Sequence, residues 1–113
     1  MIFHMKKFLV IYRMDIEAMK KMMETATPEE KQKGMDEWKA WMTAHSADLA
    51  DMGGPTGKNT SVTKDGSTEV SNDIGGYTVI QAESKEAAVA LLAGNPHFSM
   101  PGSTIDLAEI MSM

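Results

Sequence analysis

The sequence predicts an α+β protein with a ferredoxin-like βαββαβ order, in which helices cover one face of an antiparallel sheet. Three observations carry this prediction: an apolar run rich in β-branched residues near the N-terminus, a long amphipathic segment that opens with a helix cap, and a C-terminal segment with strand alternation. At 113 residues the chain is long enough for one compact domain and too short for two ordinary ones. We therefore expect a single domain over residues 1–113.

The first strand is predicted over residues 6–14, KKFLVIYRM, where β-branched and aromatic side chains predominate. A short amphipathic helix is predicted next, over residues 15–26. The long helix that follows has a strong start signal, because Thr27 can cap it, Pro28 fits its first position and Glu30 completes a capping box.

Helical spacing continues far along this long segment. The apolar stripe is formed by Met35, Trp38, Met42, His45 and Leu49. Trp41 falls one position off the stripe and is expected at its edge. The pattern predicts that the helix runs to residue 52 and ends at the glycines that follow.

The second half of the chain alternates strands and a helix. Residues 59–71 predict two short polar strands joined by a turn at Asp65-Gly66, at a sheet edge or protruding from it. Residues 75–84, GGYTVIQAES, predict a clear strand. Ser84 can cap a helix over residues 85–93, which Gly94 would end in a left-handed conformation. Residues 103–111, STIDLAEIM, alternate as a strand does.

One face of such a sheet is left without a cover. Strand side chains such as Phe8, Val10, Val79 and Ile110 would need one. A second copy of the chain is the simplest cover, so we expect a homodimer.

Composition excludes several classes of protein. The net charge of −5 and the single arginine, Arg13, argue against nucleic-acid binding. The chain has no cysteine, which excludes disulfides, a thiolate nucleophile and cysteine-bound zinc. No run approaches the roughly 20 apolar residues of a membrane span, so we expect no membrane contact and a cytoplasmic protein. The histidines lack the local spacing of a metal site, and neither a metal nor another cofactor is predicted.

His97 is the first candidate for chemistry. It follows Pro96 directly after a predicted helix end, so its place in a loop is fixed. Two interpretations stay open: a loop histidine that donates to a backbone carbonyl, or an acid/base group that faces a ligand.

Two carboxylates on the long helix are the second candidate. Asp36 and Glu37 precede Trp38, and helix geometry directs at most one of them along the apolar stripe. They form either a solvated face or a site with a general base beside the tryptophan. In the second interpretation Trp38, Trp41 and Tyr77 wall a ligand cleft.

The order of segments resembles that of a known family. The strand GGYTVIQAES, the helix KEAAVALLA and the segments GNPHF and PGSTIDLAEIM follow one another as in the YCII-related family of small bacterial proteins. The resemblance implies a single YCII-like domain that forms a dimeric α/β barrel, in which two ferredoxin-like sheets pack face to face.

The resemblance also implies where a site would lie. The family's site is a histidine on the long helix paired with an aspartate after the second helix, and these positions fall on or near Glu37 and on Asn95. The Pro96-His97 pair resembles a variant of the branch with an Asp-Gly-Pro-Phe motif, although VSNDIGG stands in place of that motif here.

Two functions follow from these observations. The first is acid/base catalysis on a small organic molecule, by isomerisation, elimination or dehalogenation, with His97 and Glu37 as acid and base. Its binding residues would be Asn95, Asp36, Trp38, Trp41 and Tyr77. The alternative is a non-catalytic homodimer that binds a small ligand or a protein.

Overall fold

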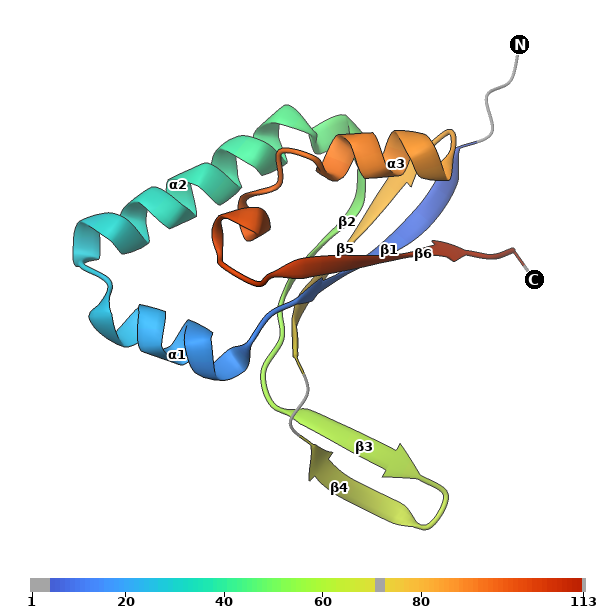
Figure 1. The fold of residues 1–113 in the computed structure, drawn as a ribbon. Helices are drawn as coiled ribbons and strands as arrows, with labels where there is room; N and C mark the ends of the chain where they lie inside the picture. Colours follow the sequence, from blue (N-terminus) through green and yellow to red (C-terminus); the bar gives the residue numbers. More distant parts are fainter. Residues whose placement is uncertain (1–4, 71–72, 113) are drawn as a thin grey trace.

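The structure is a computed structural model that describes residues 5–70 and 73–112. Figure 1 shows the elements in chain order. They are β1 (Lys6–Arg13), α1 (Ile16–Thr25), α2 (Pro28–Ala44), the 3₁₀ turn η1 (Ser46–Asp48), β2 (Leu49–Pro55), β3 (Asn59–Thr63), β4 (Gly66–Val70), β5 (Ile74–Ala82), α3 (Lys85–Leu92), the 3₁₀ turn η2 (Pro96–Ser99) and β6 (Thr104–Ile110).

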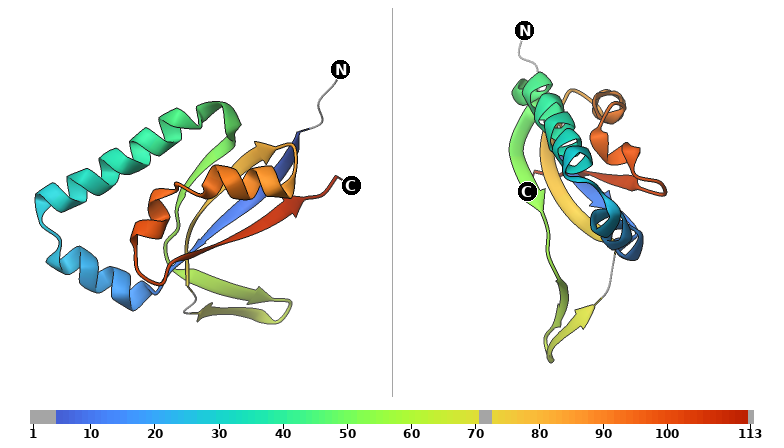
Figure 2. Two further views of the ribbon diagram at one scale, coloured as in Figure 1. Left: turned by 45° about the horizontal axis from the view of Figure 1, so that its top comes forward. Right: turned by 90° about the vertical axis from the view of Figure 1, so that its left-hand side faces the viewer.

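The main sheet has the strand order β2-β5-β1-β6, and each neighbouring pair is antiparallel. Figure 2 shows α2 and α3 on one side of this sheet. The predicted α+β, ferredoxin-like fold is therefore confirmed. Among the described residues, no helix is both long and apolar enough to cross a membrane.

Strand alternation determines which side chains form the core. Phe8, Val10 and Tyr12 point from β1 toward the helices, and residues between them on β1 point to the opposite face. The core is completed by Ile80 and Ala82 from β5, Trp41 from α2, and Ala88 and Leu92 from α3.

Most local signals in the sequence produced the predicted elements. Thr27 caps α2 by accepting the N–H of Glu30 at 3.1 Å, and Ser84 caps α3 by accepting the N–H of Ala87 at 3.1 Å. The strands predicted over residues 6–14, 75–84 and 103–111 are present as β1, β5 and β6. These elements follow from short-range side-chain and backbone chemistry.

The predicted end of the long helix was wrong. α2 ends at Ala44, and Leu49–Pro55 leave the helix to form β2, an edge strand of the main sheet. Backbone pairing with β5 outweighs the helical spacing of the apolar residues in this segment. The register between β2 and β5 is interrupted by two irregularities. At one of them Gly53 has φ +63, and a Cβ there would lie 1.9 Å from the carbonyl oxygen of Tyr77.

The hairpin predicted over residues 59–71 forms, but β3 and β4 make a two-stranded sheet of their own. It protrudes from the end of the main sheet, one of the two positions that the sequence predicted. Residues 71–72, at its predicted end, lie outside the described residues. The edge of the main sheet next to β5 is instead formed by β2, which the sequence did not predict as a strand.

The buried face of α2 also differs from the predicted stripe. Trp41 is its buried residue, while Trp38 and Met42 are partly buried and Met35 is 65% exposed. Because α2 extends beyond the edge of the sheet, its N-terminal half has little to pack against. Spacing alone gave no information about where the sheet ends.

Two smaller predictions were also wrong. Gly94 does not adopt a left-handed conformation, and the chain turns because the N–H of Asn95 bonds the carbonyl of Leu92 at 3.0 Å. Phe8 and Val10 do not share a face with Val79. They point to the helices, whereas Val79 lies opposite Leu9 on the other face of the sheet.

That other face is uncovered in the single chain. We call it the open face, and its apolar side chains are Leu9, Ile11, Tyr77, Val79, Ala108 and Ile110. The molecule is correspondingly thin, with extents of 52 × 45 × 19 Å. Its radius of gyration is 16.0 Å, compared with about 13 Å for a compact domain of this length.

Candidate active site

Tyr12 lies at the centre of the polar groups that are buried between the helices and the sheet. Its neighbours across the sheet are Gly76 of β5 and Ile105 of β6. A Cβ on Gly76 would lie 3.6 Å from the Tyr12 ring and 3.0 Å from the carbonyl oxygen of Gly54. The glycine thus lets the tyrosine ring lie over β5 while β2 stays close on the other side.

A chain of hydrogen bonds passes through the Tyr12 hydroxyl. Asn95 Nδ2 donates to this hydroxyl at 3.3 Å, and the hydroxyl lies 3.0 Å from Thr78 Oγ1. Thr78 Oγ1 in turn donates to the carbonyl of Met52 at 3.4 Å. Because an amide N–H only donates and a carbonyl only accepts, the Tyr12 hydroxyl is left to donate to Thr78. Donation therefore passes in one direction from η2 to β2.

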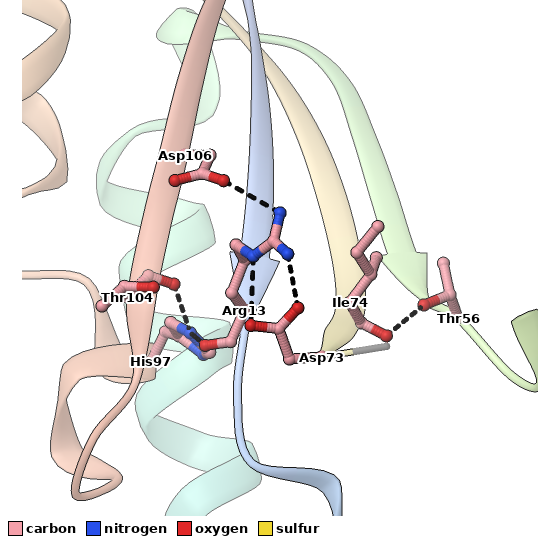
Figure 3. A network of polar contacts seen from close by, with 7 residues as sticks. All are labelled: Arg13, Thr56, Asp73, Ile74, His97, Thr104 and Asp106. Atoms are coloured by element: carbon pink, nitrogen blue, oxygen red, sulfur yellow. Dashed lines mark hydrogen bonds and ion pairs between the residues drawn. The ribbon is translucent and has the colours of Figure 1, made fainter. Parts of the chain in front are cut away.

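Asn95 also positions His97. Its Oδ1 accepts the backbone N–H of His97 at 2.9 Å and so caps η2, and both side chains are buried. The Nε2 atom of His97 lies 2.8 Å from the carbonyl of Arg13 and 2.9 Å from that of Thr104, as Figure 3 shows. Carbonyls only accept, so Nε2 carries a proton, and in the neutral form of the ring Nδ1 would be the basic nitrogen.

Five rings form what we call the aromatic cluster: Tyr12, Trp38, Trp41, His45 and His97. Tyr12 meets Trp38 edge to face with centroids 5.3 Å apart and lies 5.1 Å from His97. Trp38 meets Trp41 at 6.2 Å, and Trp41 meets His45 at 4.9 Å. The cluster connects α2 to the centre of the sheet.

Within the described residues, the indole Nε1–H of Trp41 is buried and has no hydrogen-bond partner. Trp41 as a whole is 6% exposed. Buried N–H groups in proteins are nearly always paired, so a donor without an acceptor among the described residues is unusual.

The predicted site residues lie in three separate places. Trp38, Trp41, Asn95 and His97 lie between the helices and the sheet. Tyr77 lies on the open face, where its hydroxyl donates to Asp51 Oδ2 at 3.3 Å.

Asp36 and Glu37 are exposed on the outer side of α2, where they line a shallow depression with Glu29 and Lys33. Asp36 accepts a hydrogen bond from Gln32 at 2.9 Å. The single chain therefore does not bring Glu37 into the buried group that contains His97.

Sequence reasoning missed Tyr12 and Thr78 as members of this group. Both were counted only as strand residues. The sequence nevertheless contains a signal for both residues. Tyr12 and Thr78 each carry a hydroxyl at a helix-facing position of a strand, and the other helix-facing side chains of these strands are mostly apolar. Such hydroxyls need a partner when they are buried.

Arg13, the next residue after Tyr12, points to the open face and forms two ion pairs. Its Nε donates to Asp73 Oδ2 at 3.2 Å and its Nη1 to Asp106 Oδ2 at 3.0 Å. The hydrogen bond from Arg13 holds the pKa of Asp73 below its usual value, and the same bond raises the pKa of Arg13. This arginine ties β1 to β6 and to the residue that precedes β5.

In residues 5–70 and 73–112 no group of three or more histidine, aspartate and glutamate side chains is arranged to hold a metal ion. The buried group of Tyr12, Thr78, Asn95 and His97 contains no carboxylate. Its chemistry is that of hydrogen bonding and of one imidazole.

No family model and no curated protein matches this sequence. The fold is similar to that of the 5-chloro-2-hydroxyhydroquinone dehydrochlorinase TftG from Burkholderia phenoliruptrix AC1100, solved in complex with 2,5-dihydroxybenzoquinone. That likeness has a TM-score of 0.52 and 14% identity, over 88% of this chain and 90% of that one. A weaker likeness, with a TM-score of 0.35 and 10% identity, is to an unknown protein from Galdieria sulphuraria, over 97% of this chain and 47% of that one.

Proposed function

We propose that this protein is a homodimer that binds a small organic molecule at the aromatic cluster. The observation that carries the binding site is the buried, unpaired Nε1–H of Trp41. A ligand with a carbonyl, phenol or carboxylate oxygen would supply the missing acceptor, and the neighbouring rings would pack against its planar body. His45, whose ring is tilted by 42° against that of Trp41 and whose side chain is 30% exposed, offers the route from solvent.

The homodimer is supported by the open face of the sheet. Leu9, Ile11 and Val79 form an apolar strip across its two central strands. Monomeric soluble proteins rarely expose a large apolar patch, and a second copy that presents the same face would bury both. The resemblance of the sequence to the YCII-related family, in which two sheets pack face to face, agrees with this arrangement.

Proton transfer by His97 is the second candidate function. The two carbonyls that hold Nε2–H leave Nδ1 as the basic nitrogen of the ring. The structural neighbour TftG is named as a dehydrochlorinase, a reaction class within the eliminations and dehalogenations expected from the sequence. In this mechanism His97 removes a proton from the bound molecule without Glu37, which lies on the outer side of α2.

The binding proposal is tested by calorimetric titration with 2,5-dihydroxybenzoquinone, catechol and salicylate. At least one of these planar probes is expected to bind once per chain. Trp41→Phe should weaken that binding at least tenfold, because phenylalanine keeps an aromatic ring but has no N–H. The matched control is Tyr77→Phe, which removes a hydroxyl on the opposite face of the sheet. Absence of binding by all three probes, or equal binding by Trp41→Phe, would contradict the proposal.

Proton transfer is tested by chloride release from chlorinated hydroxyquinones. The informative variant is His97→Gln, because the glutamine amide N–H can still donate to the carbonyls of Arg13 and Thr104 but is not a base. Loss of the reaction in a variant that is still folded at the assay temperature, as thermal unfolding shows, supports the mechanism. A reaction at the wild-type rate removes His97 from it.

A further inference from the structure

The β3–β4 hairpin extends beyond the main sheet, as both figures of the fold show. All of its residues from Thr60 to Val70 are exposed, and Asn59 is half-buried. Within the described residues, the side-chain bonds of this segment are local: Thr63 bonds Gly66 and Asp65, and Lys58 pairs with Glu69 at 3.9 Å.

An isolated two-stranded hairpin is marginally stable in water. Here both strands have five residues in continuous register, and all residues from Thr60 to Val70 are exposed. The hairpin therefore forms without a core of its own, and a surface outside its own chain would stabilise it.

The register divides the hairpin into two faces, because directly opposed residues point to the same side. One face carries Glu69 with Thr60, Val62 and Ser67. The other, which we call the uncharged face, carries Asn59, Ser61, Thr63, Thr68 and Val70. An uncharged face of β-branched and small polar side chains can pack against protein without burying a charge, whereas packing the other face would bury the carboxylate of Glu69.

The position of the hairpin relates it to the open face of the main sheet. β3 follows β2 after three residues, Thr56, Gly57 and Lys58, and β4 returns toward β5. The open face is about 27 Å long and four strands wide. The hairpin continues from one end of this face, and its residues from Thr60 to Val70 are exposed, so it would add to the area that a second copy buries there.

We infer that the β3–β4 hairpin is an arm that packs its uncharged face on the second subunit. This inference rests on the proposed homodimer and adds a specific part to it. The arm would then be ordered by the dimer, and the dimer would be strengthened by the arm.

The test compares two neighbouring positions of β4 that point to opposite faces. Thr68→Arg places a charge on the uncharged face, and Ser67→Arg places the same charge on the other. Sedimentation equilibrium should show a dimer dissociation constant at least tenfold higher for Thr68→Arg and changed less than threefold for Ser67→Arg. Both positions are exposed, so the fold of each variant is checked by its unaltered melting temperature at high protein concentration.

Hydrogen exchange of the hairpin amides provides an independent readout. They should be protected in the wild-type dimer and exchange rapidly in a variant made monomeric by Leu9→Arg on the open face. Protection that persists in this monomer would overturn the arm, because another contact would then hold the hairpin.

The two proposals fail in different ways. If the wild type is a monomer at 100 µM, the homodimer and the arm are both overturned. If the wild type is a dimer whose hairpin amides are unprotected, and Thr68→Arg dimerises equally well, only the proposed packing of the hairpin on the second subunit is overturned. Equal weakening by Thr68→Arg and Ser67→Arg would contradict the assignment of the packing face.

Discussion

The side-chain amide of Asn95 donates a hydrogen bond to the hydroxyl of Tyr12, 83 positions earlier in the chain, over 3.3 Å. Asn95 caps η2 and Tyr12 lies on β1, so the bond fastens the segment after α3 onto a central strand of the sheet. Both are buried, at 3% and 6% exposure. This contact makes the turn at Asn95 part of the core.

Tyr12→Phe should destabilise the protein by about 1–3 kcal/mol, because it leaves the buried Asn95 amide without its acceptor. Thr78 keeps its bond to the carbonyl of Met52 and so loses less. Urea unfolding measures the change. The control is Thr25→Val on α1, which should cost less than about 0.5 kcal/mol because the hydroxyl bond of Thr25 to the carbonyl of Lys21 is exposed.

His97→Ala should cost about 2–4 kcal/mol, because it removes a buried ring and the donor that serves two backbone carbonyls. His97→Gln should recover a substantial part of that loss. Nitrogen NMR of the ring should show the proton on Nε2. A proton on Nδ1 instead would contradict the hydrogen bonding described for this histidine.

Gly53→Ala should destabilise by more than about 1 kcal/mol, since the residue has φ +63 and the new methyl group would meet the carbonyl of Tyr77. The neighbouring Gly54→Ala is a matched control, because a Cβ there has no atom within 4 Å and its φ is not positive. Thermal unfolding of the two variants gives the comparison. Equal melting temperatures would contradict the close approach of β2 to β5.

Leu9→Arg should convert the dimer to a monomer, because it places a charge at the centre of the open face. Val89→Arg is the control, since Val89 is a 57% exposed residue of α3 on the helical side. Sedimentation velocity distinguishes the two species. A Leu9→Arg protein that sediments like the wild type would show that the open face is not the interface.

Acid should weaken the contact between Arg13 and Asp73. The pKa of Asp73 is lower in the folded protein than the usual pKa of an aspartate, chiefly because of the hydrogen bond from Arg13. A lowered folded pKa stabilises the protein above the unfolded pKa, and this contribution is lost as the pH falls through the folded pKa.

Asp73→Asn should therefore reduce stability at pH 7 and flatten the decline in stability below about pH 4. An Asp73→Asn profile parallel to that of the wild type would show that the pair does not contribute to acid sensitivity.

Elements with local signals were predictable from sequence. The caps at Thr27 and Ser84, the alternation over residues 103–111 and the β-branched run after Lys6 each depend on residues a few positions apart. Such patterns determine a helix start or a strand without reference to the rest of the chain. They also correctly identified a sheet with one uncovered face.

The candidate site was less predictable. His97 was identified from its place after a helix end, and Asn95 from a resemblance, but neither pattern shows which side chains face them. Glu37 was paired with His97 in the sequence interpretation, and the rotation of α2 instead directs it to solvent. A rotation by one residue on a helix changes the direction of a side chain by about 100°.

By itself, then, the sequence determined the fold class, most of the elements and the presence of an imidazole after α3. Only the tertiary structure decided that residues 49–55 are a strand, that Trp41 is buried with an unpaired N–H, and that Tyr12, Thr78 and Asn95 share one line of hydrogen bonds. The physical reason is the separation along the chain over which each kind of interaction acts. Caps and periodicity act within a few residues, whereas strand pairing, helix rotation and buried hydrogen bonds depend on groups brought together from distant parts of the chain.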